Sequence, residues 1–121
     1  GNRGQIGQVI LNLLNNAIDS IGKSKDPWIK LNLTHEGDFV ALYIIDSGDG
    51  IPQEIVDKIF VPMYSTKDVG KGTGLGLSLS KKFMEQNGGS IEYDSTQGNT
   101  CFKIRMKVGE KKEEDTDNQA A

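Results

Sequence analysis

The sequence is poor in the residues that build disulfides, cysteine clusters and metal-binding histidine pairs. Among 121 residues there is one cysteine, Cys101, and one histidine, His35. A single cysteine excludes an internal disulfide and a multi-cysteine metal site. Because Cys101 falls in an alternating, strand-like pattern, we expect it to be a small buried residue, and a reducing compartment is compatible with it.

The chain also lacks an excess of positive charge and any long apolar run. The formal net charge is −3 and no segment concentrates lysine and arginine, so we expect no nucleic-acid partner. No apolar stretch approaches the roughly 20 residues that cross a membrane, and no signal peptide is visible. We therefore expect a cytoplasmic domain without membrane contact of its own, which leaves open a membrane-anchored parent protein.

Glycine, in contrast, is abundant, with 15 residues. Four of them alternate with other residues at Gly70, Gly72, Gly74 and Gly76, immediately before a helical pattern. Glycine buries no side chain and loses the most backbone entropy on folding, so this spacing favours a loop that approaches a ligand. The helix that follows offers unpaired N–H groups and a positive dipole end, which suits phosphate. The spacing is neither that of a P-loop nor that of G-x-G-x-x-G.

Hydrophobic periodicity predicts three helices and four strands. In chain order they are a helix over 2–22, strands over 28–35 and 39–46, a short helix over 53–58, a helix over 74–87, and strands over 90–94 and 100–108. This order predicts an α+β fold, a two-layer α/β sandwich with helices on one face of a mostly antiparallel mixed sheet. We expect a first strand to be missing upstream. Residues 1–108 form one expected domain, and the polar residues 109–121 are expected to be a disordered tail.

Three further expectations concern individual segments. The strand over 39–46 is apolar almost throughout, which predicts a central, buried position. In the helix over 74–87, the inward residues are expected to be Leu75, Leu79, Phe83 and Met84. Residues 60–71 have no clear period, and a loop of this length is usually functional or mobile. We expect residues 61–73 to be mobile without a ligand and ordered with it.

The first helix carries Asn12, Asn16 and Asp19 on one face, opposite its apolar face. Amide and carboxylate oxygens are good ligands for Mg²⁺, which also keeps waters and phosphate oxygens. A plain solvated helix face is the alternative interpretation, although asparagine is disfavoured in helix interiors.

Asp46 ends the apolar strand and is followed by Gly48 and Gly50. A carboxylate at that position can accept from an exocyclic amine, and glycines let the backbone lie against a flat ring. An ordinary Asp-Gly turn is the alternative. Further along, Phe60 is expected to anchor the long loop on the core. Lys67 either reaches a terminal phosphate as a point charge or faces water.

Four segments, in this order and spacing, resemble the sequence boxes of one family. The segments resembling its N, G1, F and G2 boxes are Asn12–Ala17, Asp46–Gly50, Phe60–Lys67 and Gly72–Leu77. Together they resemble the catalytic ATP-binding domain of bacterial sensor histidine kinases, of the GHKL superfamily with the Bergerat fold. The resemblance covers about residues 1–108, and the Ser65-Thr66-Lys67 ending is similar to the nitrogen-regulation branch.

The resemblance implies roles for individual residues. Asp46 would bind the adenine amino group, Asn16 would coordinate Mg²⁺ with Asn12 close by, and Lys67 would reach the γ-phosphate of ATP. The other residues implied in nucleotide binding are Asp19, Gly48, Gly50, Ile51, Phe60, Tyr64, Thr66, Gly72, Thr73, Gly74, Leu75, Gly76, Leu77 and Thr100. The phosphoryl group would pass to a histidine on a separate dimerisation helix pair of the same protein, a homodimer. It would then pass to a response regulator receiver domain.

Two departures and three alternatives accompany this interpretation. Met63 replaces an aromatic residue of the F box, and Asp19 stands where many kinases have lysine. ATPase clamps of the same fold carry a glutamate as hydrolytic base at the position of Asn12, and an amide is too weakly basic for that role. A nucleotide-binding module without catalysis, or an anti-sigma-factor serine kinase, also stays open. His35 lies outside any phosphoacceptor pattern, so we do not expect this chain to autophosphorylate alone.

Overall fold

The computed structural model describes residues 3–22, 25–62 and 76–108. Its elements are α1 (Arg3–Ser20), β1 (Ile29–Glu36), β2 (Phe39–Asp46), α2 (Gln53–Val56), α3 (Gly76–Gln86), β3 (Ser90–Tyr93), the 3₁₀ turn η1 (Ser95–Gln97) and β4 (Thr100–Lys107). Every helix and strand that the sequence predicts is present, with ends within two residues of those expected. The predicted tail and most of the predicted mobile loop lie outside the described residues.

The four strands form one antiparallel sheet in the order β1-β2-β4-β3. The apolar strand β2 is central, as its composition predicts. Its register places Asp46 opposite Ile29 of β1 and opposite Thr100 of β4. The end of β2 therefore brings a carboxylate and a hydroxyl together at one edge of the molecule.

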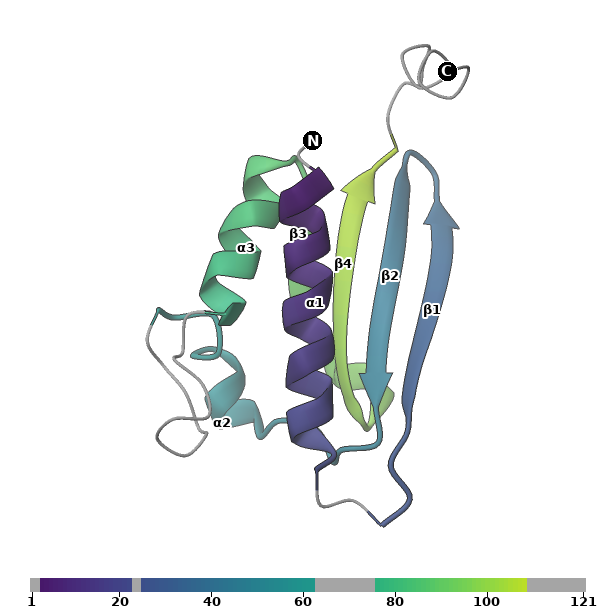
Figure 1. Cartoon of the computed structure of the whole chain (residues 1–121), viewed down its shortest axis with the longest axis vertical. Helices are drawn as coiled ribbons and strands as arrows, with labels where there is room; N and C mark the ends of the chain where they lie inside the picture. Colours follow the sequence, from purple (N-terminus) through teal and green to yellow (C-terminus); the bar gives the residue numbers. More distant parts are fainter. Residues whose placement is uncertain (1–2, 23–24, 63–75, 109–121) are drawn as a thin grey trace.

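Helices α1 and α3 lie side by side on one face of the sheet (Figure 1), which confirms the expected α+β class. The core between the two layers consists of Val9, Leu13, Ala17, Ile44, Ile59, Met84, Ile91, Phe102 and Ile104. Burial of each large side chain contributes about 1.5–3 kcal/mol. In the described part of the chain, no helix is long and apolar enough to cross a membrane.

The inward face of α3 differs from the one that we expected. Met84 is fully buried and Phe83 packs against the core, as expected. Leu79, in contrast, is 42% exposed, and Ser80 is fully buried in its place. Ser80 and Met84 share one row of the helix at i and i+4. A serine occupies this buried position because the Asn12 side-chain amide on α1 donates a hydrogen bond to its Oγ, at 3.2 Å.

The outer strand β1 is left uncovered by the helices. Leu31 and Leu33 pair with Ile44 and Leu42 and so lie on the helix-facing side of the sheet. They are nevertheless 55% and 66% exposed. The reason is that α1 packs over β2 and β4, and α3 over β3. The alternating pattern therefore predicted the position of the strand correctly, but it did not predict how far the apolar side chains of the strand are buried.

The opposite face of the sheet is covered by long charged side chains instead of a second helix layer. Arg105 stacks on the Phe39 ring, with its guanidinium carbon 4.2 Å from the ring centroid. The ammonium of Lys103 lies 5.2 Å from the Tyr43 ring centroid. Stems of such side chains shield apolar surface, and Cys101 on this face is fully buried, as expected.

Candidate functional site

The centre of the candidate site is the carboxylate of Asp46, the last residue of β2. The residue is only 2% exposed. Its Oδ1 accepts hydrogen bonds from the Gly48 N–H at 2.7 Å and from the Ser20 hydroxyl at 3.1 Å. Burial raises the pKa of Asp46, and hydrogen bonds from Gly48, Ser20 and Thr100 oppose that rise. A buried carboxylate with a shifted pKa is typical of a functional site.

Several hydrogen bonds connect the loop after Asp46 to the start of β4. The Gly50 N–H donates to Thr100 Oγ1 at 3.1 Å. The Gly48 carbonyl accepts from the Asn99 side-chain amide at 3.0 Å and from the Thr100 N–H at 3.3 Å. The loop thus has a fixed backbone conformation before any ligand binds, which lowers the entropic cost of binding.

Both glycines of this loop are required by the local geometry. A Cβ on Gly48 would lie 2.5 Å from Ser20 Oγ, 2.8 Å from Asp46 Oδ1 and 2.9 Å from Thr100 Oγ1. Gly50 adopts a φ of +93°, which side chains rarely adopt. The expectation that these glycines bring the backbone against the flat ring of a ligand stays a prediction. At Gly48 the crowding groups are the protein's own oxygen atoms.

A row of aromatic rings supports the loop from the side of the core. The Ile51 N–H donates to the Tyr93 hydroxyl at 2.8 Å. The Tyr93 ring meets Phe102 edge to face at a centroid distance of 5.5 Å, and Phe102 meets Phe60 in the same way at 6.3 Å. Phe60 is half-buried against the core, as expected for an anchor of the segment that follows it.

The polar face of α1 runs beside α3 and ends near Asp46. Besides donating to Ser80, Asn12 accepts at Oδ1 from the Gln8 side-chain amide at 3.1 Å. Asn16 is half-buried one turn later, and Asp19 is exposed next to Ser20. The face is therefore not simply solvated, because Asn12 belongs to the interface between the two helices.

A divalent cation could be held here only with oxygen atoms from a ligand. No cluster of three or more His, Cys, Asp or Glu residues suited to a metal occurs within 3–22, 25–62 and 76–108. The amide oxygens of Asn12 and Asn16 lie one turn apart on α1. Because Mg²⁺ typically takes one or two protein oxygens together with waters and phosphates, this donor set fits Mg²⁺ bound with a nucleotide. Asn12 Oδ1 also accepts a hydrogen bond from the Gln8 side-chain amide.

The structure brings the predicted residues Asp46, Gly48, Gly50 and Thr100 into direct contact. Gly76 begins α3, and Leu77 packs against the core. The predicted residues outside the described ranges are Tyr64, Thr66, Lys67, Gly72, Thr73, Gly74 and Leu75, and their roles stay predictions.

Four residues of the site escaped the sequence reasoning. Ser20, Ser80, Tyr93 and Asn99 all hydrogen-bond to residues that the sequence had singled out or to their neighbours. No motif or period marks any of them, because their partners lie at least 26 residues away in the chain.

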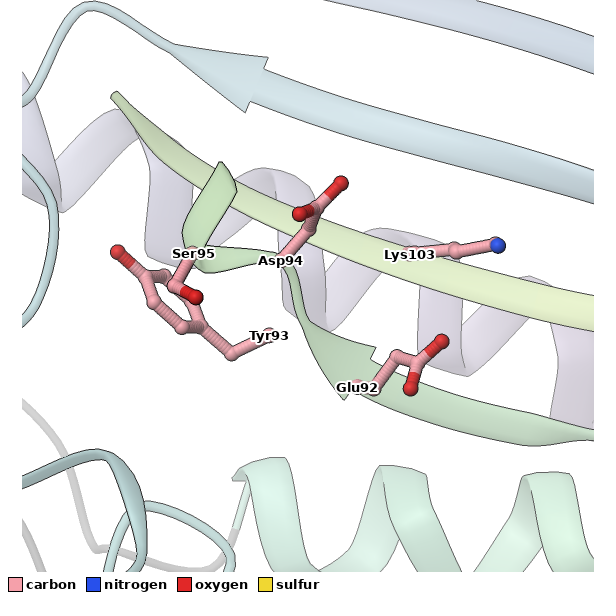
Figure 2. A pocket seen from close by; sticks show the side chains of 5 residues that line it. All are labelled: Glu92, Tyr93, Asp94, Ser95 and Lys103. Atoms are coloured by element: carbon pink, nitrogen blue, oxygen red, sulfur yellow. The ribbon is translucent and has the colours of Figure 1, made fainter. Parts of the chain in front are cut away.

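A polar pocket of about 230 Å³ lies at the end of β3, beside β4. It is lined by Glu92, Tyr93, Asp94, Ser95 and Lys103 (Figure 2). The Tyr93 hydroxyl points away from the charged ends of Glu92 and Lys103, and the Asp94 carboxylate points in a third direction. These groups do not converge on a common centre, and the connection of the pocket to the loop after Asp46 is the hydrogen bond from the Ile51 N–H to the Tyr93 hydroxyl.

Comparison with solved structures gives the class of protein to which this fold and site belong. The catalytic domain of the histidine kinase ThkA, in a nucleotide-free crystal form, superposes with a TM-score of 0.76 at 33% identity. The superposition covers 88% of this chain and 68% of that one. The fold is therefore that of a histidine kinase catalytic domain. The profile of the family described as histidine kinase-, DNA gyrase B- and HSP90-like ATPase matches residues 1–110, and the chain belongs to this family.

Similar curated proteins are sensor kinases. The chain is 36% identical over 107 residues to the C4-dicarboxylate transport sensor protein DctB of Rhizobium meliloti (strain 1021), covering 88% of this chain and 17% of that protein. It is 40% identical over 115 residues to the sensor kinase CckA of Brucella abortus (strain 2308), covering 84% and 12%. It is 34% identical over 113 residues to the sensory histidine kinase/phosphatase NtrB of Proteus hauseri, covering 86% and 32%. The chain thus spans less than a third of each relative.

Proposed function

We propose that residues 1–108 are the catalytic domain of a sensor histidine kinase, which binds Mg²⁺-ATP and transfers its γ-phosphoryl group to a histidine. The phosphoacceptor histidine lies on a separate helix pair of the same protein, a homodimer, and a response regulator receiver domain receives the group next. Residues 109–121 are a polar tail. The observation that supports the proposal best is the buried Asp46 carboxylate beside a pre-formed glycine loop.

In this proposal Asp46 selects the base. Its Oδ1 accepts from Ser20 and from the Gly48 N–H, and Thr100 also hydrogen-bonds to the carboxylate. We assign to Oδ2 the hydrogen bond from the exocyclic amine of adenine. The backbone of Gly50 and Ile51, held by Thr100 and Tyr93, lies against the ring. A guanine would present a carbonyl oxygen to the carboxylate, and two acceptors repel each other.

The phosphates extend from the base toward α1 and the start of α3. Asn16, with Asn12 beside it, would hold Mg²⁺, which would neutralise charge on the phosphate oxygens. The backbone of residues 72–77 cradles the phosphates at a helix N-terminus, and Lys67 contacts the γ-phosphate. Catalysis then comes from positioning and electrostatic stabilisation, as is general for phosphoryl transfer.

Calorimetric titration with a non-hydrolysable ATP analogue tests the proposal directly. We expect binding that tightens when Mg²⁺ is added, and we expect Asn16→Ala to remove most of the gain from Mg²⁺ without affecting binding in its absence. Failure of the wild-type chain to bind with or without Mg²⁺ would refute the proposal. Adding a cognate histidine helix pair in trans then separates a kinase, which labels it from ATP, from a passive binding module.

The identity of residue 12 separates transfer from hydrolysis. We expect Asn12→Glu to raise multi-turnover ATP hydrolysis by at least about tenfold, since a positioned general base typically contributes 10²–10⁴-fold. The substitution is compatible with the fold because the Ser80 hydroxyl, which now accepts from Asn12, can donate to a carboxylate. Asn12→Gln, equal in length and without a base, is the matched control. Equal hydrolysis by the two variants would show that residue 12 is not at the base position.

A further inference from the structure

We propose that Ser20 is a positioning residue for nucleotide binding: its hydroxyl fixes the orientation of the Asp46 carboxylate so that Oδ2 faces the base. This inference rests on the proposed function and extends it to a residue outside the sequence boxes. Ser20 is the last residue of α1, one position after Asp19. Its role depends on where the helix ends relative to the end of β2.

The geometry around Asp46 identifies Ser20 as half of a clamp. The Gly48 N–H approaches Oδ1 from the loop at 2.7 Å, and the Ser20 hydroxyl approaches the same oxygen from α1 at 3.1 Å. These two donors on Oδ1, together with the hydrogen bond from Thr100 to the same carboxylate, restrict the rotation of the carboxylate about its own axis. The close packing shows in the space above Gly48, where a Cβ would meet oxygen atoms of Ser20, Asp46 and Thr100 within 2.9 Å.

Ser20 also favours the ionised carboxylate, which is the form that accepts from an amine. Burial raises the pKa of Asp46, and the Ser20 hydrogen bond is one of three that oppose the rise. Removing the hydroxyl therefore raises the pKa of Asp46 further. As the pH falls, ATP binding by a chain without the Ser20 hydroxyl should therefore begin to weaken at a higher pH than ATP binding by the wild-type chain.

The other groups around Asp46 are the same in the wild-type chain and in the Ser20 variants. On β4, Thr100 is uncharged, and burial raises the pKa of the Cys101 thiol to about 11. On β1, the facing residue is the apolar Ile29. The nearest carboxylates along α1 and the loop, Asp19 and Asp49, are exposed and present in every variant.

The test is the affinity for ATP as a function of pH for Ser20→Ala and Ser20→Thr. At neutral pH we expect Ser20→Ala to weaken binding about tenfold, because the carboxylate loses a hydrogen bond that orients it. We also expect the acid limb of the Ser20→Ala profile, the pH range in which the affinity falls as the pH is lowered, to lie at higher pH than in the wild-type chain. Ser20→Thr keeps the hydroxyl and should restore both affinity and pH profile. Ser90→Ala, at the far end of β3, is the matched control and should bind as the wild type does. If alanine prevents folding, Ser20→Cys provides a weaker donor of similar size.

Two results would overturn the inference while leaving the proposed function intact. One is wild-type affinity in Ser20→Ala at every pH. The other is an equal loss of affinity in Ser20→Ala and Ser20→Thr with an unmoved acid limb, which would indicate packing alone. If the wild-type chain binds no ATP, the proposed function fails first, and this inference fails with it.

Discussion

Replacing Asp46 by asparagine is expected to lower the affinity for ATP on the order of 100-fold without destabilising the unliganded domain. A charge-assisted hydrogen bond contributes about 1.5–3 kcal/mol, and the asparagine amide would in addition point a donor at the donor amine of adenine. Asparagine still offers an Oδ1 acceptor to Gly48 and Ser20, so the loop should keep its conformation. Calorimetric titration measures the loss of affinity. Asp26→Asn, in an exposed loop, is the matched control.

The pH dependence of the stability of Asp46→Asn distinguishes this buried carboxylate from an ordinary surface carboxylate. Because burial raises the pKa of Asp46 in the folded state, the folded chain binds a proton more readily than the unfolded chain. The contribution of Asp46 to stability is therefore present at low pH and is lost as the pH rises through its folded-state pKa. Thermal unfolding of Asp46→Asn should lack this decline, so at neutral pH the variant should be at least as stable as the wild type. A clearly lower melting temperature at neutral pH, or near wild-type affinity, would contradict the assignment.

Alanine at position 89 is expected to destabilise the fold by about 3 kcal/mol or more. Gly89 joins α3 to β3, and a Cβ there would overlap the backbone carbonyl of Arg105 and approach Met84 Cε to 2.9 Å. Neither the Arg105 backbone nor the Met84 side chain can move easily to make room for the Cβ. Ser90 pairs with Arg105 in the β3–β4 ladder, and Met84 is fully buried in the core.

Gly7 provides the control for this prediction. It lies within α1, and a Cβ added there would meet no neighbouring atom within 4 Å. Gly7→Ala should therefore stabilise the domain by roughly 0.5–1 kcal/mol through helix propensity. Urea unfolding of the two variants should give shifts of opposite sign. Equal stability of Gly89→Ala and the wild-type chain would mean that α3 and β3 can separate at little cost.

The elements of this fold were predictable from the sequence where a pattern is local. The apolar run of β2 indicated both its ends and its central position, and the three- and four-residue spacing indicated α1. The inward face of α3 was not predictable in the same way. Leu79 continues an apolar spacing, but Ser80 is buried instead because Asn12, 68 residues earlier, supplies its hydrogen bond.

The residues of the candidate site were likewise predictable only where a local pattern marks them. Asp46 and its glycines stand out because a carboxylate and small residues follow an apolar strand. Ser20, Tyr93 and Asn99 do not stand out, since each binds a residue 26 to 51 positions away. A single hydroxyl or amide carries no periodicity, so its role appears only when the fold has brought its partner within reach.

The aromatic rings of Tyr93, Phe102 and Phe60 do more than fill the core. They lie in edge-to-face contact in series, so in a close-packed interior the position of each ring restricts the position of the next. The Tyr93 hydroxyl holds the Ile51 N–H. A continuous series of contacts therefore joins the backbone at Phe60 to the loop after Asp46.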